Sequence, residues 1–236
     1  MPRITEERRQ ARREQILDAA RACLLEHGLE AVSMEMIIAR SGLSTGAVYR
    51  YFKGKEQIMV AAFTATVSEI GAAAVPVLAS PKSRLPAELI EELLATWVGY
   101  ARSGVGAAAG IDRMPVALHG WSYAQTEPEL EAAVRAGLRG FRERCVPVIK
   151  QWQADGVVAA TADPGAVAQL ILSICLGFVA QRSLTGDAEV QAHSDALAAL
   201  VAARPASGRS TRRPQPAETD ATAAETQQKH GRPRAS

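Results

Sequence analysis

The stretch from Ser33 to Lys55, SMEMIIARSGLSTGAVYRYFKGK, constrains the fold more than any other part of this chain. Ser33 can accept a backbone N–H as the N-cap of a helix over 34–41, and Gly42 tolerates the left-handed conformation that ends a helix. Ser44 is a second N-cap, and it opens another short helix. Two short helices joined by so tight a turn predict a helix-turn-helix, whose second helix enters the DNA major groove.

The second helix of this pair is expected to have an inward and an outward face. Helical spacing turns Val48 and Phe52 inward, whereas Gly46 lets the outward face approach DNA closely and Arg50 can bind guanine with two hydrogen bonds. The candidate base contacts are Ser44, Thr45, Gly46 and Arg50. The candidate phosphate contacts, which carry hydroxyl or ammonium groups, are Ser33, Tyr49, Tyr51 and Lys55. Core packing is the alternative for Tyr51.

A first helix over about 7–27, ended by Gly28, is expected to brace this pair. Its opening turns carry four arginines that could reach phosphates or the adjacent minor groove. They are Arg8, Arg9, Arg12 and Arg13. The alternative is a solvated face on which these arginines alternate with glutamates.

The whole N-terminal segment resembles the DNA-binding domain of the TetR/AcrR family of bacterial transcription regulators. The matching residues are Ser33, Ile37, Gly42, Leu43, Ser44, Gly46, Tyr49, Tyr51, Phe52, Lys55 and Glu56. Ile38 and Ser41 depart from the pattern, because the family usually has Ala there. The resemblance implies an all-α protein, in which a three-helix helix-turn-helix DNA-binding domain precedes a helical ligand-binding and dimerisation domain.

Composition and charge fit this organisation. Apolar residues make up 47% of the chain, enough to bury a core, and Ala is abundant while strand formers are sparse. Residues 1–55 carry 10 basic and 7 acidic side chains, whereas residues 56–203 carry 10 and 15. We therefore expect a basic DNA-binding domain over 1–55 and an effector-binding and dimerisation domain over 56–203. Residues 204–236 are rich in Pro, Ala, Ser, Thr and Gln without an apolar period, which predicts a disordered tail.

Periodic apolar residues predict the helices of the second domain. Their expected ranges are 55–75 ending before Pro76, 87–102, 112–123, 129–154, 164 to about 187, and 189–203. Pro147 should kink the helix over 129–154, and a kinked helix that faces aromatic residues can leave a cavity open. The resemblance implies a ligand pocket in this region. The candidate ligand contacts are Trp97, Trp121, Phe141, Cys145 and Phe178, with simple core packing as the alternative.

The expected helix that begins at Pro164 is apolar over more than one face, so it needs a partner beyond the core of its own chain. The resemblance implies that the last two helices join those of a second copy in a four-helix bundle. The candidate interface residues are Ile171, Ile174, Phe178, Leu197 and Leu200. Burial wholly within one chain is the alternative.

Other features point to a cytoplasmic protein without a cofactor or a metal. Cys23, Cys145 and Cys175 lie in apolar helical patterns, which indicates buried free thiols, with a redox switch as the alternative. The charged N-terminus predicts no signal peptide, and the apolar run over 167–180 is too short and interrupted to span a membrane. The four histidines are scattered, and no catalytic motif is recognisable.

We therefore expect a TetR-like homodimer that binds double-stranded operator DNA, with no membrane partner. The expected mode of action is repression, relieved by a small and largely apolar ligand. An architectural DNA-binding protein without an effector is one alternative, and an enzyme with a helical fold is another. A cavity lined by Trp and Phe would favour the ligand-responsive regulator, whereas a closed core would favour the architectural protein.

Overall fold

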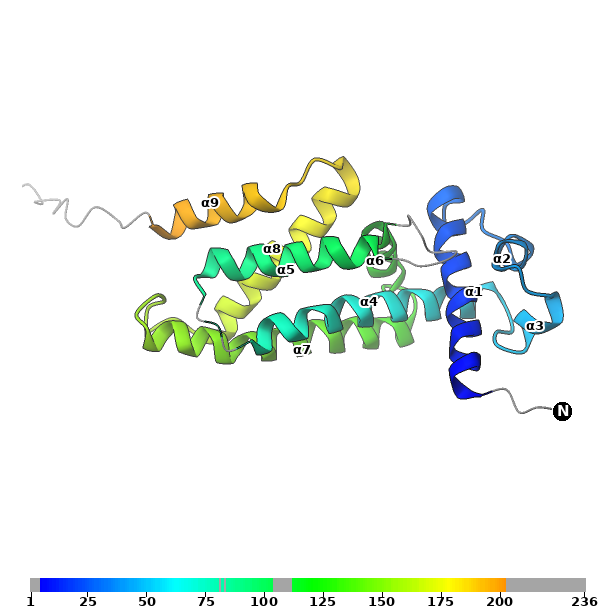
Figure 1. Ribbon diagram of the computed structural model, residues 1–236, viewed down its shortest axis with the longest axis horizontal. Coiled ribbons are helices and arrows are strands. Elements are labelled where there is room, and N and C mark those ends of the chain that lie inside the picture. Colours follow the sequence, from blue (N-terminus) through cyan, green and yellow to red (C-terminus); the bar gives the residue numbers. More distant parts are fainter. Residues whose placement is uncertain (1–4, 81, 83, 104–111, 203–236) are drawn as a thin grey trace, which may run out of the picture. The chain divides into compact units, whose positions relative to one another are not determined.

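The computed structural model describes residues 5–80, 82, 84–103 and 112–202, and all regular structure in these ranges is helical (Figure 1). The helices are α1 (Glu6–His27), α2 (Met34–Ser41), α3 (Thr45–Tyr49), α4 (Lys55–Ala79), α5 (Pro86–Arg102), α6 (Arg113–Tyr123), α7 (Pro128–Ala154), α8 (Pro164–Thr185) and α9 (Val190–Ala202). The all-α prediction is confirmed. The expected disordered tail over 204–236 lies outside the described residues.

We call α1–α3 the head and α4–α9 the body. Helix α4 connects them, since it contacts α1 at one end and runs beside α7 along the body (Figure 1). Its first half contributes Ile58 and Phe63 to the core of the head, and its second half contributes Val77 and Leu78 to the core of the body. The core of the head thus extends past the domain boundary expected after Lys55.

Helix α4 also corrects one expected boundary, because it continues through Pro76 to Ala79. A proline inside a helix removes one backbone hydrogen bond. Here Pro76 is exposed, while the two residues after it, Val77 and Leu78, are each only 6% exposed. The burial of these two apolar side chains offsets the lost bond, so that the helix ends one turn later than predicted.

Helix α6 approaches α4 closely at Gly120. A Cβ atom on Gly120 would lie 3.2 Å from the Cβ of Phe63, closer than ordinary van der Waals contact. Phe63 is fully buried, and its ring also lies against Tyr123 with the centroids 5.6 Å apart. The absence of a side chain at Gly120 therefore sets how closely α6 packs against α4.

Candidate nucleic-acid interface

The helix-turn-helix forms as the sequence predicts, because both expected caps are present. The hydroxyl of Ser33 accepts the backbone N–H of Met36 at 3.3 Å, and that of Ser44 accepts the N–H of Ala47 at 3.3 Å. Gly42 ends α2 with φ of 66°, a conformation that strains residues with a Cβ. These contacts fix where α3 begins and in which direction it runs.

Helix α3 ends at Tyr49, and beyond its end the Phe52 N–H donates to the carbonyl of Val48 at 3.1 Å. Val48 and Phe52 are buried, as predicted, and anchor this segment to the core of the head. The Arg13 guanidinium lies 5.4 Å from the centroid of the Phe52 ring. Arg13 is therefore engaged within the head. Arg12 also has a partner on its own helix, because it donates to the Gln15 side chain at 3.0 Å.

The outward face of α3 carries the predicted base contacts. Ser44, Thr45, Gly46 and Arg50 are all exposed. Apart from its two chain neighbours and the backbone of its own helix, no atom of the described residues lies within 4 Å of a Cβ built on Gly46, so a surface can approach the backbone here. Among the predicted phosphate contacts, Tyr49 is 49% exposed, whereas Ser33, Tyr51 and Lys55 are partly buried.

A hollow of about 510 Å³ beside α3 brings α1 and the helix-turn-helix together. Its lining residues are Arg9, Arg12, Gly42, Leu43, Ser44, Ala47, Arg50 and Tyr51. Arg9 and Arg12 lie three positions apart on one face of α1, but Arg8 and Arg12, or Arg9 and Arg13, are also helical neighbours, so that spacing alone could not have singled out this pair. Three guanidinium groups around one hollow suit a polyanion, because arginine donates paired hydrogen bonds to phosphate oxygens.

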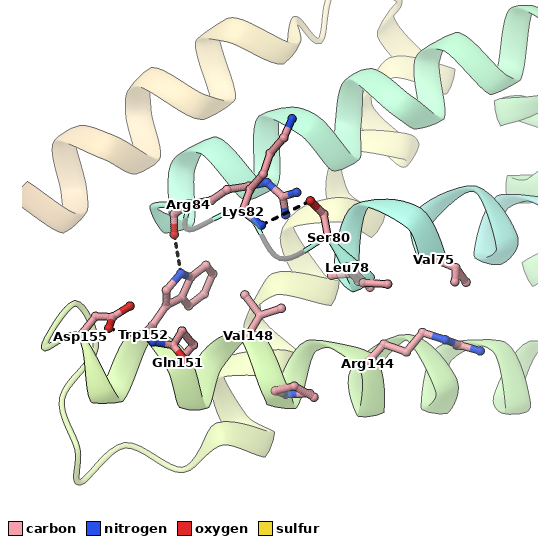
Figure 2. Close-up of a pocket in the computed structure, with 12 residues that line it drawn as sticks. Val75, Leu78, Ser80, Lys82, Arg84, Arg144, Val148, Gln151, Trp152 and Asp155 are labelled. Carbon is pink, nitrogen blue, oxygen red and sulfur yellow. Dashed lines mark hydrogen bonds between the residues drawn. The ribbon is translucent and has the colours of Figure 1, made fainter.

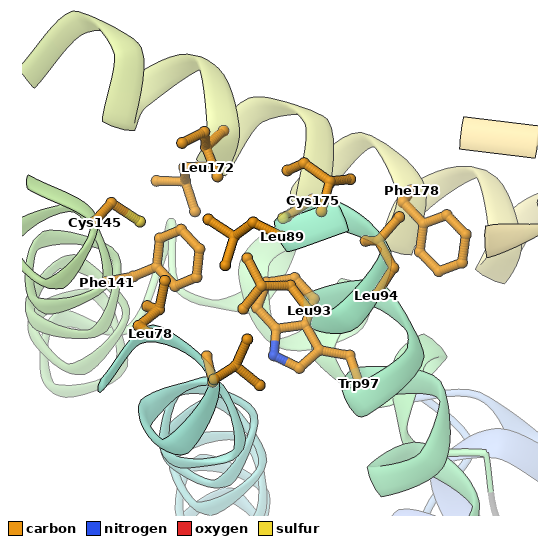
Figure 3. Packing of buried hydrophobic residues seen from close by; sticks show 14 of the residues in the cluster. Leu78, Leu89, Leu93, Leu94, Trp97, Phe141, Cys145, Leu172, Cys175 and Phe178 are labelled. Carbon is orange, nitrogen blue, oxygen red and sulfur yellow. The ribbon is translucent and has the colours of Figure 1, made fainter. Parts of the chain in front are cut away.

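The predicted ligand contacts lie in the core of the body, where Figure 3 shows four of them among leucines. Cys145 and Phe178 are fully buried, and the rings of Trp97 and Phe141 lie 5.9 Å apart. Trp121 is only partly buried. The indole N–H of Trp97 is buried and has no hydrogen-bond partner among the described residues.

A cleft of about 620 Å³ lies elsewhere in the body, between the end of α4 and the second half of α7 (Figure 2). Its lining residues are Val75, Leu78, Ala79, Ser80, Lys82, Arg84, Arg144, Pro147, Val148, Gln151, Trp152 and Asp155, and they include none of the five predicted contacts. The Trp152 indole N–H donates to the Arg84 carbonyl at 2.5 Å. Arg84 Nε lies 2.7 Å from a carboxylate oxygen of Glu92.

The predicted interface residues separate into two groups. Ile171 and Phe178 are buried in the core of their own chain, whereas Ile174 and Leu197 are partly buried and Leu200 is 75% exposed. Two further apolar residues of α8 are exposed, Leu170 at 60% and Leu184 at 75%. The wide apolar arc of α8 is thus divided between the core and the surface.

Two family models match parts of this sequence. The model of bacterial regulatory proteins of the tetR family matches residues 16–62, and that of the C-terminal part of BetI-type transcriptional repressors matches residues 107–205. The chain belongs to the TetR family. Its head contains the helix-turn-helix that defines the N-terminal part of this family.

Curated relatives and solved structures agree with the TetR assignment. An HTH-type transcriptional repressor of Mycobacterium tuberculosis is 36% identical over 61 residues, which are 26% of this chain and 33% of the relative. The chain thus spans about a third of the length of the first relatives that it matches. The regulator BetI of Serratia proteamaculans is 25% identical over 187 residues, 79% of this chain and 88% of BetI.

Similarity to solved structures concerns the fold. A TetR transcription regulator from Haloarcula marismortui superposes with a TM-score of 0.63 at 20% identity, covering 82% of this chain and 97% of that one. A transcriptional regulator from Saccharomonospora viridis in complex with choline also gives 0.63, at 18% identity, covering 81% and 96%. The arrangement of head and body is therefore that of known TetR structures.

Proposed function

We propose that this TetR-family chain is a transcriptional repressor that binds double-stranded operator DNA through α3 and the arginine-lined hollow. The observation that carries the proposal is the convergence of the exposed face of α3 with Arg9 and Arg12 on one side of the head. Thr45, Gly46 and Arg50 meet base edges, because they lie on the outward face of α3. Arg9 and Arg12 bind phosphates and orient the head on the duplex.

The remaining predicted DNA contacts take positioning roles in this proposal. Tyr49 and Tyr51 present hydroxyl groups toward phosphate oxygens, and Lys55 adds a charge at the first turn of α4. Ser33 and Ser44 already cap helices through their oxygen atoms, but each hydroxyl can still donate its own hydrogen. Each of these two hydroxyl groups thus caps a helix and also contacts DNA.

The repressor acts as a homodimer in this proposal, with α8 and α9 as the interface. The exposed leucines Leu170, Leu184 and Leu200 support this assignment, since water otherwise contacts them. Ile174 and Leu197 lie at the margin of the same surface, whereas Ile171 and Phe178 support it from the core. A twofold axis would present two heads to half-sites about one helical turn, roughly 34–36 Å, or a multiple of it apart.

A small-molecule effector controls DNA binding in this proposal. The cleft at the end of α4 offers an apolar wall that includes Leu78 and Trp152, both of which also belong to the core that contains Trp97 and Phe141. The buried indole N–H of Trp97 has no partner among the described residues, which is costly, so in this proposal it donates a hydrogen bond to a polar atom of the effector. In this proposal an apolar effector binds against this wall of the cleft, which belongs to the same core as Trp97 and Phe141.

An architectural DNA-binding protein without an effector is the second candidate. The tight packing of Phe141, Cys145 and Phe178 favours it, since these side chains line no part of the cleft. Thermal unfolding with a library of apolar compounds separates the two candidates. A compound that raises the unfolding temperature and releases operator DNA supports the regulator. If no compound stabilises the protein, the result supports the architectural protein.

The proposed location is the cytoplasm, without a membrane partner and without catalytic activity. Helices α4 and α8 are long and apolar enough to cross a membrane by length and composition alone. The apolar run over 167–180 was expected to be too short, but α8 extends it to Pro164–Thr185. Packing of α4 against α7 and of α8 against α6 and α7 supports instead a role in the body.

Selection of duplexes from a random pool by the purified protein tests DNA binding. An enriched sequence should bind with an affinity that falls steeply with salt, because phosphate contacts release counterions. Tyr49→Ala should weaken this binding. Arg139→Gln, which removes an exposed charge on α7, is the control and should have little effect. Equal binding of enriched and random duplexes would refute the proposal.

A further inference from the structure

The junction between head and body contains a buried arginine that the proposed function does not use. Arg21 of α1 has no exposed surface, and its guanidinium contacts Glu14 at 2.5 Å and Asp18 at 2.7 Å on its own helix. Across the junction it donates to the Thr66 hydroxyl of α4 at 3.1 Å and lies 3.6 Å from Glu69. A buried charge is tolerated only when it is paired, so Arg21 ties α1 to α4.

A second arginine connects two of these carboxylates, Asp18 and Glu69, to α6. Arg113, in the first turn of α6, lies 3.5 Å from the Asp18 oxygen that contacts Arg21 and 3.4 Å from the second oxygen of Glu69. Only 11% of the Arg113 side chain is exposed. Asp18, Arg21, Glu69 and Arg113 therefore form a closed ring of alternating charge, here called the ion-pair ring, which joins α1, α4 and α6.

Helix α5 contributes Tyr100 to this junction. The Tyr100 hydroxyl donates to Glu69, accepts a hydrogen bond from Arg113 at 3.1 Å, and its ring lies under the Arg113 guanidinium. Burial and the charge of Glu69 raise the pKa of Tyr100 above its ordinary value, so the hydroxyl remains protonated at neutral pH. Helices α4, α5 and α6 of the body thus meet at one set of charges.

The distances within the ion-pair ring are uneven. The contact between Arg21 and Asp18 within α1 is 2.7 Å, whereas the contacts between different helices measure 3.4 to 3.6 Å. Arg21 Nη2 and Arg113 Nε are buried without a hydrogen-bond partner among the described residues. Buried donors that are only partly satisfied leave room for another helix arrangement with shorter contacts.

We propose that the ion-pair ring positions the head relative to α4 and α6, and that a shift of these helices acts on DNA binding through this ring. The inference rests on the proposed DNA-binding function and extends it to named residues. A displacement of α4 at Glu69, or of the first turn of α6 at Arg113, changes the partners of Asp18 and Arg21. Both of these residues lie on α1, the helix that also carries Arg9 and Arg12.

The physical basis is the cost of leaving a charge unpaired at a buried site. Opening a side of the ring at Arg21 removes a partner from a side chain that has no contact with water. Opening a side at Arg113 removes a partner from Asp18 or Glu69. To keep these charges paired, the head must move together with α4 and α6. The junction therefore has a small number of stable arrangements, and those between them are unfavourable. Apolar contacts alone would permit gradual sliding, because they do not depend on direction.

Variants at two members of the ring test the proposal without removing the fully buried Arg21. Arg113→Gln and Asp18→Asn are each expected to weaken binding of a duplex selected by the wild-type protein about tenfold, which corresponds to about 1.4 kcal/mol. The double variant should bind as the weaker single variant does, since either change opens the same ring. The affinity of each variant for the selected duplex is divided by its affinity for a random duplex, and this ratio corrects for the altered net charge.

The matched control is Arg135→Gln, because Arg135 pairs with Glu131 on the exposed surface of α7. It removes the same charge and should leave the affinity ratio within twofold of the wild type. Tyr100→Phe is the conservative variant, since it keeps the ring under Arg113 and removes only the hydroxyl, and a threefold loss is expected. Circular dichroism confirms that each variant is folded at the assay temperature.

Hydrogen exchange gives a readout that does not depend on DNA. Amide hydrogens of α1 near Asp18 and Arg21 should exchange severalfold faster in Arg113→Gln than in Arg135→Gln, while those of α9 remain unchanged. Failure of the wild-type protein to select a duplex would contradict the proposed function alone. Unchanged exchange in α1, single-variant affinity ratios within twofold of wild type, or losses that multiply in the double variant would overturn the role of the ring.

Discussion

The head and the body of this protein bury apolar cores of similar kind but display their functional groups differently. In the head, the residues predicted to contact bases are exposed on α3 and at its two ends, and the core behind them contains Val48 and Phe52. In the body, the residues predicted to bind ligand are the core itself, apart from the partly buried Trp121. A large side chain on a helical stripe therefore identifies a core more readily than a binding site.

The contrast has a physical origin in how each surface is formed. A DNA-binding face follows from one short helix, whose exposed side is fixed by its cap at Ser44 and its buried Val48. A cavity forms where several helices fail to fill the space between them, which depends on helix packing over the whole body. The cleft beside Trp152 arises in this way from α4 and α7.

The largest expected effect tests whether Phe178 belongs to the core. Phe178→Ala should lower the free energy of unfolding by about 3–5 kcal/mol, because it creates a cavity where the side chain is fully buried. Urea denaturation measures this change. Leu200→Ala, at a side chain 75% exposed, should instead weaken the dimer in sedimentation experiments. A small effect of Phe178→Ala would move this residue from the core to a surface.

Thiol reactivity offers a second test of the packed body. Burial raises the pKa of Cys145 to about 12 and raises the pKa of Cys175 as well, so the thiolate of each forms only at high pH. At pH 8 the thiolate fraction of Cys145 should be about a thousandfold lower than that of a thiol of ordinary pKa. Ellman's reagent should react slowly with the native protein, faster as the pH rises, and at once in denaturant. Rapid reaction of the native protein would favour the redox alternative.

Two arginines of the head should separate base recognition from phosphate binding. Arg50→Gln should cost about 1–3 kcal/mol on the selected duplex and relax its sequence preference, because it removes a base contact. Arg12→Gln should weaken all duplexes to a similar degree and reduce the salt slope by about 1. Fluorescence anisotropy across a salt series measures both. An identical pattern for the two variants would show that α3 does not read bases.

The smallest expected effect concerns the cap that orients α3. Ser44→Ala should lower the free energy of unfolding by about 1 kcal/mol, because the N–H of Ala47 loses its acceptor. Ser68→Ala, at an exposed serine within α4, is the control and should change stability by less than about 0.5 kcal/mol. Thermal unfolding measures both variants. Equal stability of the two would mean that the cap contributes nothing to the head.

Much of the fold could be predicted because its signals are local. The caps at Ser33 and Ser44, the positive φ of Gly42 and the start of α8 after Asp163 each depend on residues within one turn. The end of α4 could not be predicted in this way. Pro76 is a local signal to stop, whereas the burial of Val77 and Leu78 is set by the packing of the body.

The sequence by itself determined the helical fold, the helix-turn-helix and the outward face of α3, since side chains three or four apart share a helix face whatever surrounds them. Only the tertiary structure decided which apolar residues line a cleft, which α8 residues remain exposed, and that Asp18, Arg21, Glu69 and Arg113 meet. Members of the ion-pair ring are up to 95 positions apart in the chain. No helical period relates such residues, so only the packing of α1, α4 and α6 brings their charges together.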